Sequence, residues 1–174
     1  MDFRPLFRSQ TQVVISDSLA RELGEALDTL QVQKVLILLD QNIQDLPALR
    51  SLQQQLPTYA LRTEVIEVRE PDVAWVDEQV DKVRDFKPDV VVGVGGGSLI
   101  DLAKAVSVLL ENPGLAASYQ GSNLIKRPGT RKIMIPTTAG TGSDVTPGAV
   151  VTNLETGRKG AISSPHVVPD VSIL

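Results

Sequence analysis

Apolar residues along the chain follow two patterns: short continuous runs, and stripes with a spacing of three or four. A continuous run such as "KVLILLD" at 34–40 is typical of a strand buried on both faces of a parallel sheet. Short apolar or alternating segments predict further strands at 12–15, 61–68, 89–94, 132–136, 148–153 and 170–174. Stripes predict the helices between them, from Leu19 to Leu30, from Ile43 to Leu56 before Pro57, from Val73 to Val83 before Pro88, and from a glycine turn to about Leu110.

The order of these elements predicts the fold class. Strands that alternate with helices indicate an α/β protein, with a Rossmann-like parallel sheet covered by helices on both faces. A length of 174 residues is that of one domain, so residues 1–174 are predicted to form a single domain. Ligands of such folds bind at the carboxyl ends of the strands, and both glycine-rich loops of this chain follow strands.

Composition limits the classes of partner. The formal net charge is −4 and the lysines and arginines are scattered, so no nucleic-acid partner is expected. The N-terminus "MDFRPLFRSQTQ" has no apolar signal core, and no segment approaches the ~18 apolar residues of a membrane span. We therefore expect a cytoplasmic protein with no membrane partner. With no cysteine and a single histidine, His166, no metal site is expected within the chain.

The segment "GVGGGSLID", residues 93–101, is the first candidate site. Its three consecutive glycines let the backbone approach a ligand closely, and the following helix offers unpaired N–H groups and a positive dipole end, which favours a pyrophosphate. Ser98 is expected either to cap the helix or to donate to a phosphate oxygen. Asp101 is placed for a capping box and for an ion pair with Lys104. The alternative is structural: glycines that permit tight packing, and polar residues that only stabilise the helix.

Two familiar phosphate motifs do not fit this turn. The dinucleotide fingerprint G-x-G-x-x-G needs glycine where Ser98 stands, and it expects the ribose-binding acid after the glycines, whereas Asp40 precedes them. A P-loop needs Lys-Ser or Lys-Thr after the glycines. The turn therefore belongs neither to an ordinary Rossmann unit nor to a kinase or GTPase.

A second loop, "IPTTAGTGSDVTPG" at 135–148, combines glycines with an unusual density of hydroxyl side chains. Hydroxyls and exposed N–H groups on one rim suit a polyhydroxylated ligand such as ribose, or a carboxamide. The alternative is a turn whose hydroxyls bond to its own backbone. The hydroxyl residues of the loop are Thr137, Thr138, Thr141, Ser143 and Thr146.

Together, "GGGSLIDLAKA" and "IPTTAGTGSDVTPGAVVTN" resemble the iron-containing, or group III, alcohol dehydrogenase family. The resemblance extends over nearly the whole chain, including "FKPDVVVGVGGGS" and "SPHVVPDVSIL". It implies hydride transfer between an alcohol and a nicotinamide cofactor, with Fe²⁺ or Zn²⁺ held by an all-helical domain of the complete enzyme. That domain is expected to be missing here. The chain alone is therefore expected to bind the cofactor, to bind no metal and to lack activity, and no catalytic residue is assigned.

The resemblance also implies which residues wrap the pyrophosphate. These are the residues that match the family's glycine-rich stretch, to which we add the acid one turn further along: Gly95, Gly96, Gly97, Ser98 and Asp101.

Five further residues match positions along the rest of the cofactor. Thr137, Thr138 and Thr141 match hydroxyl residues near the nicotinamide half, and Lys159 matches a lysine directed at the nicotinamide ribose. Asp40 matches the acidic strand end that meets the adenosine ribose, where a carboxylate favours NAD over NADP. For Asp40 the alternative is a cap of the helix after its strand.

The sequence departs from the family's pattern at two positions. Glu70 precedes Pro71 where many relatives have Asn-Pro, so no role is assigned there, and Asp144 stands where glutamate is common. Two other functions stay open: a nucleotide-binding or regulatory module without catalysis, and a lyase-type relative such as dehydroquinate synthase, which the second loop resembles less. A face shaped to pack on a helical domain would be apolar, so self-association is also expected.

Overall fold

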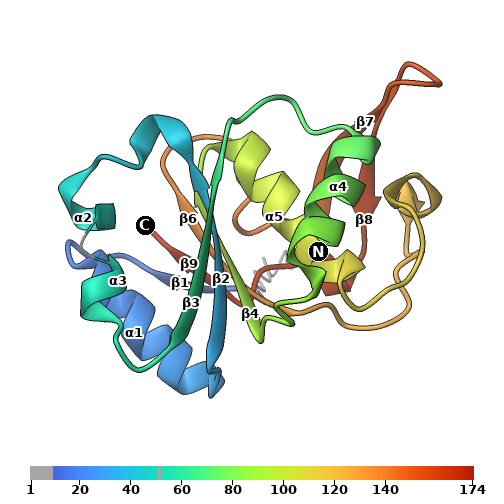
Figure 1. The fold of residues 1–174 in the computed structure, drawn as a ribbon. Coiled ribbons are helices and arrows are strands. Elements are labelled where there is room, and N and C mark those ends of the chain that lie inside the picture. The colour runs from blue at the N-terminus through green and yellow to red at the C-terminus, as the bar shows by residue number, and fades with distance from the viewer. Residues whose placement is uncertain (1–9, 51) are drawn as a thin grey trace, which may run out of the picture.

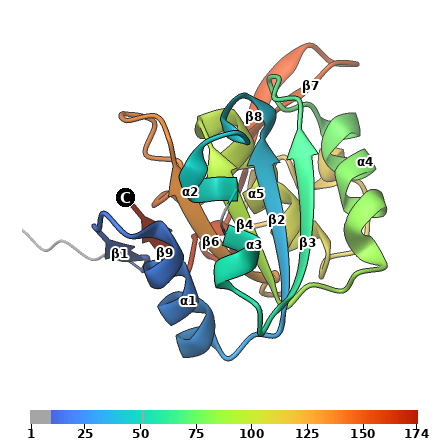
Figure 2. The same ribbon diagram turned by 60° about the vertical axis from the view of Figure 1, so that its left-hand side comes forward.

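The structure, a computed structural model, describes residues 10–50 and 52–174, so most of the N-terminal segment considered for a signal sequence lies outside the described residues. Six parallel strands form the main sheet in the order β1-β9-β6-β4-β2-β3, as Figures 1 and 2 show. Their bounds are Gln12–Val14 (β1), Lys34–Asp40 (β2), Ala60–Ile66 (β3), Val90–Gly95 (β4), Arg131–Pro136 (β6) and Val171–Ile173 (β9).

Helices cover both faces of this sheet (Figure 2), which confirms the predicted fold class. On β2, Val35, Ile37 and Leu39 pack in one hydrophobic cluster with residues of α1, α2 and α3, whereas Leu36 and Leu38 pack in the other with α4 and α5. This alternation is what a continuous aliphatic strand requires, because its successive side chains point to opposite faces. The helices are α1 (Leu19–Leu30), α2 (Pro47–Arg50), α3 (Leu52–Gln55), α4 (Val73–Arg84) and α5 (Gly97–Leu109).

A second, three-stranded sheet lies against α5. Its order is β5-β8-β7, with β5 at Gly121–Ser122, β7 at Gly148–Asn153 and β8 at Arg158–Ser163, and β7 is antiparallel to β8. Ala149, Val151 and Ile162 of this sheet join the same cluster as α5. Since α5 is enclosed between two sheets, every residue from Leu99 to Leu109 is buried, including Asp101, Lys104 and Ser107.

Two predicted elements differ in the structure. The strand predicted at 148–153 forms as β7, but it lies outside the parallel sheet, and its partner β8 was not predicted because "RKGAIS" has no apolar run. The helix predicted from Ile43 to Leu56 is instead a 3-10 helix, η1 (Gln41–Ile43), followed by α2 and α3. Pro47 begins α2, as expected for a residue without an N–H group, which is tolerated only in a helix's first turn.

The remaining elements are two short 3-10 helices, η2 (Ala116–Tyr119) and η3 (Pro165–Val167). Among the described residues, no helix combines the length and the apolar character that crossing a membrane requires.

Candidate functional site

The two glycine-rich loops leave neighbouring strands at the same edge of the main sheet. Strand β4 pairs with β6, and Gly95 lies opposite Pro136 at the carboxyl end of both. The Thr137 N–H donates to the Gly95 carbonyl at 3.0 Å, which extends the pairing into the loops. The structure therefore brings the two predicted loops together at the edge where ligands of parallel α/β sheets bind.

The glycine turn and the threonines of the second loop are in contact. A Cβ atom added at Gly97 would lie 2.9 Å from Thr141 Cγ2, and one at Gly96 would lie 3.3 Å from Thr138 Oγ1. A side chain at Gly97 would thus force Thr141 to shift, and one at Gly96 would leave only a tight contact with Thr138, so the glycines allow the second loop to come close. Thr138 and Thr141 are themselves exposed residues beside the turn.

Helix α5 begins directly from the turn, without a side-chain cap. Gly96 is the N-cap residue, and the first intrahelical bond runs from the Ile100 N–H to the Gly96 carbonyl at 3.0 Å. Ser98 is therefore the second residue of the helix, and the predicted capping box of Ser98 with Asp101 is wrong. The helix starts earlier than predicted because the strand enters it through only one residue, Gly96. Uncapped N–H groups at a helix N-terminus are available to a ligand or to water.

Asp101 and Lys104 form the predicted ion pair, with 3.6 Å between Lys104 Nζ and Asp101 Oδ1. Asp101 also accepts a hydrogen bond of 2.9 Å from Ser143 Oγ, in the second loop. The Lys104 ammonium donates to the Ser143 carbonyl at 2.7 Å and to the Gly148 carbonyl. Burial lowers the pKa of Lys104 to about 8, although the Asp101 carboxylate acts in the opposite direction.

Asp144 belongs to the second loop and stands where the family usually has glutamate. Its side chain is buried. It accepts a hydrogen bond of 2.7 Å from Ser172 Oγ on β9. The loop also bonds to itself, since the Ser143 N–H donates to Thr141 Oγ1 at 3.4 Å. The self-bonded turn considered from the sequence is thus observed in part, while a role of the exposed hydroxyls in binding a ligand stays a prediction.

Asp40 lies at the end of β2, next to the glycine turn. A Cβ atom at Gly95 would be 3.1 Å from the Asp40 Cβ. The Asp40 carboxylate caps η1, because its Oδ1 accepts from the Asn42 backbone N–H at 2.9 Å and from Asn42 Nδ2 at 3.0 Å. The capping role considered from the sequence is therefore observed, at a place that also lies beside the candidate site.

Lys159 lies on β8 and forms an ion pair with Glu70, the residue that departs from the family's pattern. Lys159 Nζ is 2.7 Å from Glu70 Oε1, and Thr152 Oγ1 donates to the same oxygen at 3.2 Å. The hydrogen bond from Lys159 lowers the pKa of Glu70. Sequence reasoning missed this pair, because the two residues are far apart in the chain and β8 was not predicted.

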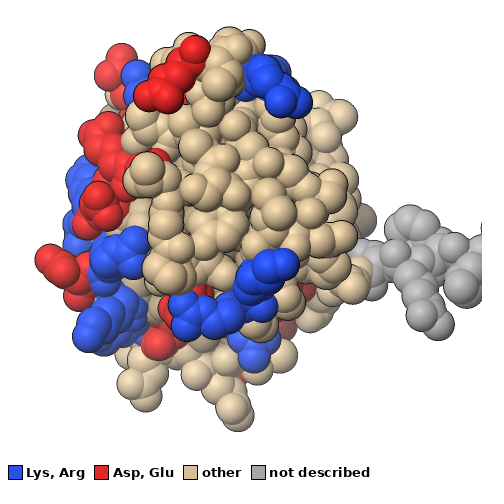
Figure 3. Space-filling view, turned by 90° about the vertical axis from the view of Figure 1, so that its right-hand side faces the viewer, with Lys and Arg blue, Asp and Glu red and all other residues tan. Residues whose placement is uncertain are grey.

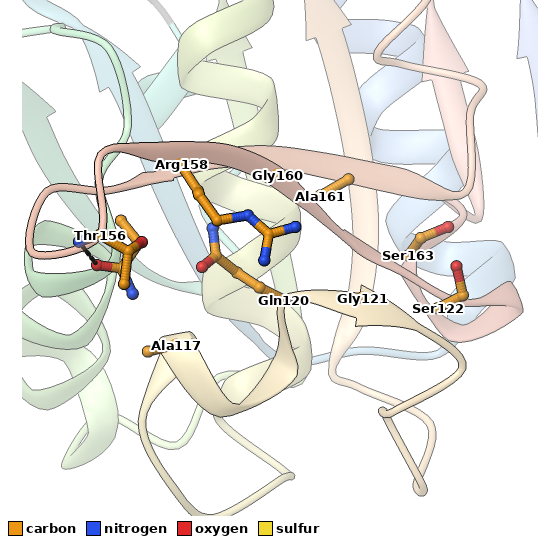
Figure 4. A pocket seen from close by; sticks show the side chains of 10 residues that line it. Ala117, Gln120, Gly121, Ser122, Thr156, Arg158, Gly160, Ala161 and Ser163 are labelled. Atoms are coloured by element: carbon orange, nitrogen blue, oxygen red, sulfur yellow. Dashed lines mark hydrogen bonds between the residues drawn. The ribbon is translucent and has the colours of Figure 1, made fainter.

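A pocket of about 470 Å³ lies apart from the predicted site, between β8 and the segment of η2 and β5 (Figure 4). The Arg158 side chain extends over it, and none of the predicted site residues lines it.

Figure 3 shows the side of the molecule at the right of Figure 1, where charged side chains gather mainly along the edges. Among the described residues, no group of three or more His, Cys, Asp or Glu side chains is arranged to hold a metal ion. His166 lies in η3.

The geometry defines an α/β fold with two glycine-rich loops at one sheet edge, and comparison with known proteins identifies its family. The sequence profile described as "Iron-containing alcohol dehydrogenase" matches residues 10–174. The chain belongs to the iron-containing alcohol dehydrogenase family.

Individual relatives agree with this assignment. The chain is 40% identical over 105 residues to a sulfoacetaldehyde reductase of Bilophila wadsworthia, a match that covers 60% of this chain and 27% of the relative. It is 31% identical over 163 residues to an NAD-dependent methanol dehydrogenase of Bacillus methanolicus, covering 92% of this chain and 43% of the relative.

A solved structure shares the fold. The crystal structure of a sulfoacetaldehyde reductase from Bifidobacterium kashiwanohense in complex with NAD⁺ superposes with a TM-score of 0.88 at 25% identity, covering 99% of this chain and 46% of that one. The present chain spans less than half the length of each of these proteins.

Proposed function

We propose that this chain binds NAD(H) across its glycine turn, as the cofactor-binding region of a metal- and NAD-dependent alcohol dehydrogenase. The observation that carries the proposal is the contact of Gly96 and Gly97 with Thr138 and Thr141 at the uncapped N-terminus of α5. Such a turn offers N–H groups and a positive dipole end to a pyrophosphate. The NAD⁺ complex of a relative with the same fold supports this assignment.

In this proposal the pyrophosphate lies over the turn. Backbone N–H groups of Gly96 and Gly97 donate to it, together with the Ser98 hydroxyl, while Gly95, which ends β4, lets the chain pass close to it. Asp101 contributes by holding Ser143, and with it the second loop, against α5.

The other candidate residues lie along the two halves of the cofactor. Thr137, Thr138 and Thr141 lie along the nicotinamide half, and Lys159 bonds to the nicotinamide ribose after leaving Glu70. Asp40 accepts from the hydroxyls of the adenosine ribose. A carboxylate there repels a 2′-phosphate, so NAD is favoured over NADP.

The cofactor supplies the hydride acceptor, while the residues of this chain bind and orient it. The side chains of the described residues do not fit a metal ion, since no group of three or more suitable ligands is present among them. The proposal therefore assigns this chain no step that involves the metal. It also predicts that the 174-residue chain alone does not oxidise alcohols. Cytoplasmic location and self-association stay predictions.

The first test is calorimetric titration of the purified chain with NADH, NAD⁺ and NADPH, without added metal. We expect NADH to bind with a Kd from micromolar to millimolar, and NADPH to bind more weakly. R158A is the matched control, because Arg158 lies at the separate pocket of Figure 4, and we expect its loss to leave binding unchanged. Failure of every dinucleotide to bind would contradict the proposal.

The second test separates an enzyme from a binding module. The 174-residue chain is incubated with NAD⁺, a panel of alcohols and Fe²⁺ or Zn²⁺, and NADH is followed by absorbance. We expect no metal-dependent formation of NADH from this chain, and we expect it from the complete natural protein. A complete protein that binds NADH without turnover would be a nucleotide-binding module instead.

A further inference from the structure

Lys104 is a fully buried lysine whose ammonium joins α5 to the second loop at two points. It donates to the carbonyl of Ser143, in the middle of the loop, and to that of Gly148, where the loop ends and β7 begins. Its side chain has no exposed surface. The backbone between these two carbonyls is thereby fixed to the same helix that starts at the glycine turn.

Burying a lysine is unfavourable unless the ammonium is well bonded, and an apolar side chain of similar length would avoid that penalty. The charged groups that surround Lys104 are Asp101 on α5, Asp144 in the loop and, with the opposite effect, Lys132 on β6. The two carboxylates face it from the helix and from the loop, so the ammonium links the two elements electrostatically as well as by hydrogen bonds.

We propose that Lys104 is a positioning residue, which holds the loop 137–147 in the shape that sets Thr138 and Thr141 against the glycine turn. That this loop serves a dinucleotide rests on the function proposed above, whereas the holding of the loop does not. Lys104 contacts the loop from the side of α5, and it is connected to the glycine turn only through that helix. It therefore acts through the threonines and not on the cofactor directly.

The test measures hydrogen exchange of loop amides in the 174-residue chain without cofactor. The reporters are the amides of Thr137 and Val145, which donate to the carbonyls of Gly95 and Gly142. In K104M we expect exchange at these amides to accelerate by roughly tenfold or more, because the loop opens locally, while amides of α1 keep their wild-type rates. The same substitution is expected to raise the Kd for NADH by roughly tenfold.

K132M is the matched control. Lys132 is also a buried lysine whose pKa is lowered by burial, but it lies at the amino end of β6, away from the loop. Because Lys132 repels the Lys104 ammonium, its loss removes no attraction that holds the loop, and we expect K132M not to accelerate loop exchange. Because the chain has no cysteine, the K104C thiol is unique. Alkylation with bromoethylamine in denaturant, followed by refolding, restores an ammonium at the length of lysine, and we expect it to restore slow exchange.

The outcomes decide whether Lys104 holds the loop in place. Unchanged loop exchange in K104M, or equal exchange in K104C before and after alkylation, would overturn the proposal. Loss of the whole fold in K104M would also overturn it, because the effect would not be local to the loop. Failure of the wild-type chain to bind NADH would instead contradict the proposed function, while the exchange measurement would still decide the role of Lys104.

Discussion

Lys159 on β8 and Glu70 in the segment before α4 form an ion pair, with 2.7 Å between Nζ and Oε1. Both side chains are more than half exposed, at 63% and 60% of their surface. The pair joins Lys159, which the proposed function places at the nicotinamide ribose, to the acid that departs from the family's pattern. In the proposed complex, Glu70 would therefore compete with the cofactor for the Lys159 ammonium.

We expect E70Q to strengthen NADH binding by a few-fold, because it frees Lys159 from the ion pair, while stability changes little for so exposed a pair. Titration of wild type, E70Q, K159M and the double variant at low and high salt measures the effect. K159M is expected to weaken binding, and the gain from E70Q should vanish in the double variant. A gain that survives there would show that Glu70 does not act through Lys159.

Asp40 caps η1 and, in the proposed complex, also accepts from the adenosine ribose, and D40N separates the two roles. Asparagine keeps an acceptor for the Asn42 N–H but loses the charge that repels a 2′-phosphate. We expect D40N to keep wild-type stability while its preference for NADH over NADPH falls by roughly tenfold. D40A is expected to lose about 1 kcal/mol of stability as well. An unchanged ratio of the two Kd values in D40N would mean that Asp40 does not contact the ribose.

The main sheet was predictable because its strands are aliphatic runs and its helices carry clear stripes. Local pattern was also enough to place the two loops at one sheet edge, since the carboxyl ends of adjacent parallel strands coincide. The β8 strand was not predictable, because its residues are mostly small or charged and only Ile162 is fully buried. β8 is a strand because it pairs with β7, and this pairing is known only once the chain has folded.

The start of α5 shows a different limit. Ser98 and Asp101 have the spacing of a capping box, but the first of three glycines ends β4 and the third already begins the helix, so Ser98 falls inside it. Similarly, nothing in the sequence shows that Lys104 faces the carbonyls of Ser143 and Gly148. Every residue has a backbone carbonyl, so a contact with one cannot be predicted from the residue types.

Gly97 tests the contact between the two loops. In G97A the new methyl group would meet Thr141 Cγ2 at 2.9 Å, and we expect a loss of roughly 1–3 kcal/mol in the free energy of unfolding, with weaker NADH binding. T141S removes Cγ2 and should recover part of both losses in the double variant, which urea unfolding and titration would measure.

G24A is the control for G97A. Gly24 lies inside α1, and its added Cβ would meet Leu56 Cδ2 at an ordinary 3.6 Å. We expect G24A to stabilise the chain by about 0.5–1 kcal/mol, since alanine favours helix more than glycine does. If G97A were as stable as wild type, the two loops would not pack as described.

Lys104 predicts a pH dependence of stability whose sign follows from its burial. The pKa of Lys104 is about 8 in the folded chain and near the ordinary value of 10.5 when unfolded, so between these values the unfolded chain binds more protons. The free energy of unfolding should therefore rise with pH across this window, by on the order of 3 kcal/mol from this residue alone. In K104M this rise in the free energy of unfolding is lost. From pH 8 to pH 10, wild type should therefore become increasingly more stable relative to K104M. Urea unfolding of both chains at several pH values checks this, and a difference that is independent of pH would show that Lys104 keeps an ordinary pKa in the folded chain.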